Sequence, residues 1–186
     1  MKLKFLATAL LAAPLCLATT VRAENTLQFR QLGAIQPSVL VAQSDWREFS
    51  SASGGFAVSM PGTPKEESDT SDDGSVEHSY TLSLEKAAFL VHYTDIPNAD
   101  ELSAEQIKEI LDDTPADFAK SAEAKLLGTR SISIDDNPGK EFEFTLSDGT
   151  PGKARVYMVK TRLYVVVGMT SESENTQRFL DSFRLL

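Results

Sequence analysis

Cysteine, histidine and tryptophan are scarce in this chain of 186 residues, which has one, two and one of them respectively. The cysteine, Cys16, lies in an N-terminal stretch that we expect to be removed. The mature chain would then have no disulfide, no thiol nucleophile and no thiolate metal site. The motifs Gly-x-Ser-x-Gly and His-Glu-x-x-His and a Gly-rich phosphate loop are also lacking. These absences argue against the common classes of enzyme.

The first 23 residues have the features of a signal peptide. Lys2 and Lys4 give a positive start, and residues 5–17 form an apolar run of suitable length. Val21 and Ala23 then supply small side chains at the third and first positions before a cleavage site. We therefore predict cleavage after Ala23 and export to the periplasm or out of the cell.

Two other interpretations of this stretch fit less well. An uncleaved membrane anchor is disfavoured because the apolar run is shorter than the roughly 20 residues that cross a bilayer. A lipid-modified Cys16 is disfavoured because Leu15, rather than a small residue, precedes it. The expected organisation is a signal peptide over 1–23, a flexible segment over 24–44 and a single domain over 45–186.

The charge balance is acidic, since the whole chain has 27 acidic and 18 basic residues. Cleavage would remove three bases, Lys2, Lys4 and Arg22, and no acid, which moves the formal net charge from −9 to −12. Such a protein repels nucleic acids and anionic membrane surfaces. We expect no nucleic-acid partner, no direct membrane insertion after cleavage, and a protein partner with a basic surface, for example within a membrane complex.

Apolar and polar residues alternate over 140–169 in three successive runs, which predicts a meander of three antiparallel strands with one apolar face. Glu141, Arg155 and Arg162 are expected to form a charged ladder on the surface of this meander. Further expected elements are a strand at 56–60, a polar loop at 65–75, a hairpin of 76–84 with 87–94, a strand at 131–134 and an extended end at 183–185.

Helical signals occur in two places. Ser103 begins a capping box that is followed by apolar residues at helical spacing. Pro115 predicts either two short helices or one kinked helix, and Gly128 is the expected end. Ser171 and Glu174 suggest a second capping box before a C-terminal helix. The order of strands, helix, strands and helix predicts an α+β fold, a mainly antiparallel sheet with helices packed on its faces.

An acidic loop matches half of a calcium-binding motif. Asp69, Ser71, Asp73 and Glu77 occupy the first, third, fifth and ninth positions of the calcium-loop pattern. The twelfth position should hold a bidentate glutamate, but the residue there is Tyr80. These four residues are therefore an incomplete calcium candidate, and we predict no tight calcium binding and no cofactor.

The two histidines could form a metal or catalytic pair only in one register of the predicted hairpin. With Glu85-Lys86 as a two-residue loop, His78 faces Tyr93, and His92 points to the opposite face. A loop longer by one residue would place His92 opposite Tyr80, on the same face as His78. The sequence does not fix this register, and ordinary strand histidines are the simpler interpretation.

Several short stretches occur in the order in which a known family has them. They are Gly54-Gly55-Phe56 leading into Val58-Ser59-Met60-Pro61, then Gly139-Lys140-Glu141-Phe142, Arg162-Leu163-Tyr164 and Ser182-Phe183. A hairpin followed by a helix after Ser103 completes the pattern. Over about residues 45–186, the chain resembles the PsbP family, the extrinsic lumenal proteins of photosystem II.

This resemblance implies a PsbP-like fold and an accessory role, with photosystem II as the complex concerned and the thylakoid lumen as a further possible destination of export. It transfers no metal site, because the histidine ligands of some members have no counterpart in the strand that reads Lys153-Ala154-Arg155-Val156. We therefore expect an exported, non-catalytic binding or assembly module. The alternative is a small exported enzyme that uses scattered carboxylates or His78 and His92.

Overall fold

The computed structural model describes residues 46–70 and 75–186, so the predicted signal peptide and the 24–44 segment lie outside the described residues. The strands are β1 (Arg47–Ser51), β2 (Phe56–Met60), β3 (Lys65–Thr70), β4 (Val76–Leu84), β5 (Ala87–Asp95), β6 (Lys125–Ile134), β7 (Asn137–Thr145), β8 (Pro151–Val159), β9 (Arg162–Thr170) and β10 (Arg184–Leu185). The helices are η1 (Ala99–Glu101, 3-10), α1 (Ala104–Ser121) and α2 (Ser173–Ser182).

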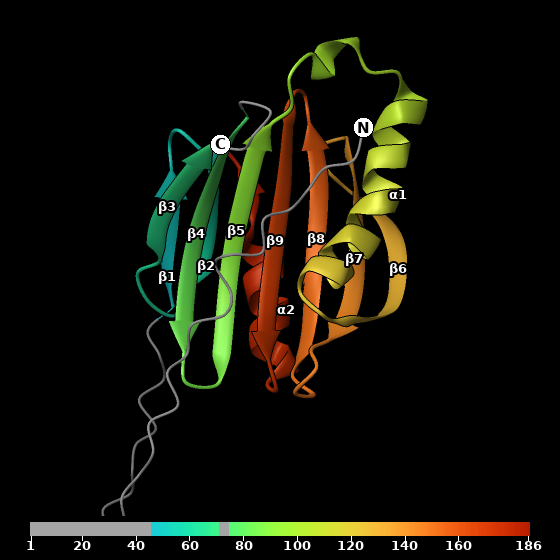
Figure 1. Ribbon diagram of the computed structural model, residues 1–186. Coiled ribbons are helices and arrows are strands. Elements are labelled where there is room, and N and C mark those ends of the chain that lie inside the picture. Colours follow the sequence, from blue (N-terminus) through green and yellow to red (C-terminus); the bar gives the residue numbers. More distant parts are fainter. Residues whose placement is uncertain (1–45, 71–74) are drawn as a thin grey trace, which may run out of the picture.

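The described strands form two antiparallel sheets. The large sheet has the order β3-β4-β5-β9-β8-β7-β6, and the small sheet has the order β1-β2-β10. In Figure 1, α1 lies in front of the large sheet over β6, β7 and β8, while α2 and the small sheet lie behind it. The architecture is thus the predicted α+β fold, a mainly antiparallel sheet with helices packed on its faces.

The predicted meander is present as β7, β8 and β9, but the expectation of a single apolar face is wrong. Val165 and Val167 of β9 lie in the core beneath α1, whereas Tyr164 and Val166 lie in the core beneath α2. All four residues are buried. Because β9 is in the middle of the large sheet and is covered on both faces, its sequence is a nearly continuous apolar run.

The two cores differ in composition. The core under α2 is mainly aromatic and includes Phe56, Tyr80, Phe89, Tyr93, Tyr164 and Phe179. The core under α1 is mainly aliphatic, apart from Phe142 and Phe144. Phe118 of α1 is only partly buried, with its ring centroid 4.9 Å from that of Phe144. Phe144, Val156 and Val165 are buried, as the alternation predicts, and Phe179 of α2 is buried as well.

Helix α1 is one continuous helix, which decides between the two predicted forms. The capping box is confirmed, because the Ser103 hydroxyl accepts the Gln106 N–H and the Gln106 side chain accepts the Ser103 N–H. Pro115 lies inside the helix, where it removes one backbone donor. The expected end at Gly128 is wrong, since α1 stops at Ser121 and Gly128 belongs to β6.

Three further expectations are corrected. The polar stretch Lys65–Thr70 is not a loop but the edge strand β3, whose polarity reflects side chains that are exposed throughout. The strand expected at 131–134 is longer, since β6 begins at Lys125. The Ser171 capping box does not form: Glu172 is the N-cap of α2, with no side-chain cap hydrogen bond. Both strand errors arise because edge strands lack a buried face that would produce alternation.

Candidate functional site

His78 and His92 lie on neighbouring strands but on opposite faces of the large sheet. Of the two registers that the sequence left open, the structure has the one with Glu85-Lys86 as a two-residue connection, which pairs His78 with Tyr93 and His92 with Ser79. The rings of His78 and Tyr93 are stacked with centroids 4.7 Å apart, and Ser79 Oγ lies 3.2 Å from His92 Nδ1. Burial, with a smaller contribution from His78, lowers the pKa of His92 to about 4. The register therefore separates the two imidazoles, and His92 is neutral at pH 7.

The calcium candidate is only partly described. Asp69 of β3 lies directly opposite Glu77 of β4, whereas Ser71 and Asp73 fall outside the described residues. Among residues 46–70 and 75–186, no group of three or more His, Cys, Asp or Glu side chains is placed to hold a metal ion. The absence of tight calcium binding stays a prediction.

Glu141 is a buried carboxylate at the centre of an ion-pair network, so the expected surface ladder is wrong. Its side chain is 3% exposed and accepts hydrogen bonds from Arg155 Nε at 2.8 Å and Arg130 Nε at 2.9 Å. Burial raises the pKa of Glu141, but the hydrogen bonds from Arg155 and Arg130 lower it by more. Arg155 also binds the Leu180 carbonyl at 2.9 Å and Asp181 Oδ1 at 2.6 Å. The network fastens α2 to the sheet.

Arg162 does not join that network. Its Nε and Nη2 bind the two carboxylate oxygens of Asp95 at 2.7 and 2.8 Å, and its Nη1 binds the Ser53 carbonyl at 2.9 Å. The guanidinium carbon lies 4.3 Å from the centroid of the Tyr93 ring. Next to it, the Tyr164 hydroxyl donates to the Gly54 carbonyl at 2.6 Å. These groups join the β1–β2 turn to the large sheet.

The outer surface of α1 presents an acidic face, which we define as Glu105, Glu109 and Asp113. The three residues are exposed and follow one another at intervals of four, so their carboxylates lie in one row along the helix. None of them forms an ion pair with another described residue. Like charges at this spacing weaken a helix by about 0.2–0.5 kcal/mol per pair. A basic surface placed against the row would reverse that repulsion.

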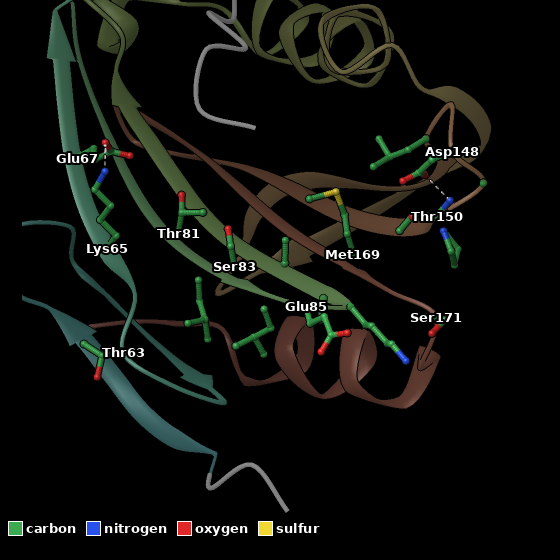
Figure 2. Close-up of a pocket in the computed structure, with 18 residues that line it drawn as sticks. Thr63, Lys65, Glu67, Thr81, Ser83, Glu85, Asp148, Thr150, Met169 and Ser171 are labelled. Carbon is green, nitrogen blue, oxygen red and sulfur yellow. Dashed lines mark hydrogen bonds and ion pairs between the residues drawn. The ribbon is translucent and has the colours of Figure 1, made fainter. Parts of the chain in front are cut away.

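A large open hollow lies at the end of the sheet where the β4–β5 turn and the β7–β8 loop meet (Figure 2). Its volume is about 1010 Å³. Lys65 and Glu67 of β3 lie on one side, and Asp148 and Thr150 of the β7–β8 loop lie on the other (Figure 2). Apolar side chains also contribute, including Leu82, Leu84, Ala88, Leu146, Pro151 and Met169.

A second hollow of about 440 Å³ adjoins the first, because Pro151 and Ser171 line both. It lies between the start of α2 and β6–β8 and includes Leu127, Glu143, Lys153 and Glu174 among its lining residues. We call the surface formed by the two hollows the hairpin end. It is the lower end of the sheet in Figure 1.

The hairpin end and the buried Glu141 network are the features that sequence reasoning missed. The residues of the hairpin end come from distant parts of the chain, and only the strand register brings them together. Glu141 alternates with Phe142 and Phe144 in the sequence, which assigns it to the opposite face of β7. No local pattern in the sequence indicates that α2 covers that face.

No protein-family model matches the chain, and no curated protein matches it. Among solved structures, it is similar to the solution structure of cyanobacterial PsbP from Synechocystis sp. PCC 6803, with a TM-score of 0.53 and 14% identity. That match covers 83% of this chain and 99% of the other. A protein of unknown function from Pseudomonas aeruginosa matches less well, with a TM-score of 0.37 and 13% identity over 69% of this chain and 85% of the other.

No helix in residues 46–70 and 75–186 has the length and apolar character needed to span a bilayer.

Since the sequence identity to cyanobacterial PsbP is low, that similarity concerns the fold rather than the function. The chain has a PsbP-like α+β fold.

Proposed function

We propose that this protein is an exported, non-catalytic binding module that docks on a basic protein surface through the acidic face of α1. The observation that supports this most directly is the row of Glu105, Glu109 and Asp113, none of which forms an ion pair with another described residue. Because the row disfavours the free helix slightly, a basic partner would gain attraction and also relieve repulsion.

The partner that we propose is a membrane complex, and photosystem II is the first to test. The PsbP-like fold and the sequence resemblance to the family of lumenal photosystem II proteins both favour it. Export follows from the predicted signal peptide, and the net charge of −12 after cleavage suits attraction to a basic lumenal or periplasmic surface. A non-catalytic role is favoured because His78 and His92 are on opposite faces of the large sheet.

Native membranes washed with increasing salt test the proposal. Attraction between exposed charges weakens as the Debye length falls to about 8 Å near 0.15 M salt and about 3 Å at 1 M. We expect the protein to sediment with membranes at low salt, to cross-link there to a basic subunit, and to be released as the salt rises. A protein that never associates at low salt, or that stays bound at molar salt, would refute docking by charge. Substrate turnover that is lost in His92→Ala would support the enzyme alternative.

A further inference from the structure

The core under α1 extends sideways beyond the helix that covers it. Helix α1 lies over β6, β7 and β8, and no described helix lies over β4 and β5 on the same side of the large sheet (Figure 1). Apolar side chains nevertheless continue across β9 to β5, where Ala88 and Leu90 are partly buried and pack against this core. We call the α1 side of β4, β5 and β9 the open face.

The strand register shows that the open face has the composition of a covered surface. Three residues of β5 pair with three of β9 on this side, Ala88 with Met169, Leu90 with Val167 and His92 with Val165. The adjoining positions of β4 are also uncharged, since they are Ser79, Thr81 and Ser83. A sheet face that meets water normally has charged side chains at alternate positions. An apolar face of this kind requires a layer packed over it.

The open face is shielded from water. Val167 and Met169 are 1% and 4% exposed. Burial, with a smaller contribution from His78, lowers the pKa of His92 to about 4, whereas an imidazole on a hydrated sheet face would keep a pKa near 6.5. Because no described helix lies over β5 on this side, the shielding of His92 calls for a further layer (Figure 1).

The chain that precedes Trp46 has the composition that such a layer needs. After the predicted cleavage it consists of residues 24–45, in which only Glu24, Arg30 and Asp45 are charged. Apolar residues are spread along the whole segment, at Leu27, Phe29, Leu32, Ile35, Val39, Leu40 and Val41. A segment with few charges and many apolar side chains suits an uncharged, apolar sheet face better than it suits water.

The position of Trp46 brings this segment within reach of the open face. The Trp46 ring lies 5.5 Å from the ring of Phe89, and the guanidinium of Arg178 lies over it at 4.6 Å. Phe89 comes between Ala88 and Leu90 in β5 and points to the α2 side, so only the thickness of the sheet separates Trp46 from the open face. A path around the β4–β5 turn is on the order of 30 Å, whereas residues 24–45 can span about 70 Å when extended.

We propose that residues 24–45 dock on the open face and form a second cover on the α1 side of the sheet, beside α1. In this arrangement the apolar side chains of the segment pack on Leu90, Val167 and Met169 and keep water from His92. The segment is then a part of the domain, and not the flexible leader that the sequence predicts. The proposal does not depend on docking through the acidic face, which is the outer surface of α1.

A spin label in the segment tests this in the mature protein, residues 24–186. The predicted mature chain has no cysteine, so Gln36→Cys provides a single site for a nitroxide. We expect the label to broaden the methyl NMR signals of Leu90, Val167 and Met169 more than those of Val58 and Leu180 in the core under α2. Equal broadening of the two groups, or no broadening, would overturn the inference.

A mixed sample distinguishes the chain's own segment from that of a second copy. It combines spin-labelled chains with isotope-labelled chains that have no spin label, so that only contacts between copies broaden the observed signals. We expect no broadening at Leu90, Val167 and Met169 in this sample. Broadening there as strong as in the singly labelled chain would mean that another copy occupies the open face, and the inference would be wrong.

Variants of the segment test whether it shields His92. Leu32→Ser with Ile35→Ser removes two apolar side chains, and Gln28→Ser with Gln43→Ser in the same segment is the matched control. We expect the first variant to raise the pKa of His92, measured by NMR titration, toward its ordinary value near 6.5, and the control to leave it near 4.

The same pKa of His92 in both variants would overturn the inference. If the first variant fails to fold, the spin-label experiment still decides, because it leaves every apolar residue in place. None of these results bears on docking through α1, which the membrane wash tests separately.

Discussion

Helices α1 and α2 pack on opposite faces of one sheet, but different forces hold them there. Arg155 binds the Leu180 carbonyl and Asp181 in α2 while it pairs with the buried Glu141 of β7. In addition, the Ser182 hydroxyl accepts the Ser59 N–H of β2 at 2.8 Å. Polar contacts of defined geometry therefore fix the position of α2 against both sheets.

Helix α1 is held mainly by apolar contact. Leu111 is buried in the core under α1, and Phe118 packs on Phe142 and Phe144. One salt bridge, from Lys140 to Asp112, joins the helix to β7. The carboxylates of its outer row take no part in holding it. We infer that the contacts of α2 serve to stabilise the fold, whereas the outer surface of α1 is available to bind a partner.

The largest expected effect is the loss of the sheet that both helices share. In Val165→Asp, a carboxylate would replace a side chain that is 4% exposed and lies directly opposite His92, which is neutral at pH 7. An unpaired buried charge costs several kcal/mol, a large part of the stability of a domain of this size. We expect an unfolded or insoluble product by circular dichroism. A soluble variant that melts cooperatively would contradict the assignment of this core.

The next largest effect is a loss of folding stability at low pH, which arises from His92 on the α1 side of the sheet. The pKa of His92 is about 4 in the folded protein and about 6.5 in the unfolded chain, so the unfolded chain takes up a proton first as the pH falls. Folding should therefore lose about 3 kcal/mol between pH 6.5 and pH 4. Urea unfolding at several pH values measures this. His92→Gln should reduce the loss over that range, and an unchanged slope would refute a buried neutral imidazole.

Glu141→Gln tests the polar attachment of α2. The amide cannot accept two charge-assisted hydrogen bonds and would leave Arg155, which is 13% exposed, without its main counter-charge. We expect a loss of about 2–3 kcal/mol in the free energy of unfolding. The lowered pKa of Glu141 also means that its contribution is present above its unfolded pKa, near 4.3, and disappears as the pH falls through the lower folded pKa. A variant as stable as the wild type would show that the network does not fasten α2.

Glu109→Gln on α1 is the counterpart of Glu141→Gln. Its effect on the free energy of unfolding should be small and of opposite sign. Glu109 lies four residues from both Glu105 and Asp113, so the substitution removes two like-charge contacts. We expect a gain of about 0.3–0.5 kcal/mol at low salt, which should vanish at high salt. Removal of the Glu141 carboxylate would then destabilise the packing of α2, whereas removal of the Glu109 carboxylate would stabilise α1. A loss of stability at low salt would mean that Glu109 has a structural partner.

The fold was largely predictable because its buried strands alternate and its α1 capping box is local in sequence. Edge strands were harder: β3 has no buried face, and β6 is interrupted by the bulge at Leu127. The small sheet depends on pairing between β2 and β10, more than 120 residues apart, which no local pattern reveals. The register of His78 and His92 depended on one residue of loop length, and the structure was needed to fix it.

The central claim is that the acidic face of α1 docks the protein. Glu105→Gln with Glu109→Gln removes two charges from that face, and Asp135→Asn with Asp136→Asn removes the same charge from the exposed β6–β7 turn. We expect the first variant to need several-fold less salt for release from native membranes, and the turn variant to behave like the wild type. Equal release curves for the two variants would contradict docking through α1 and would leave only a non-specific effect of net charge.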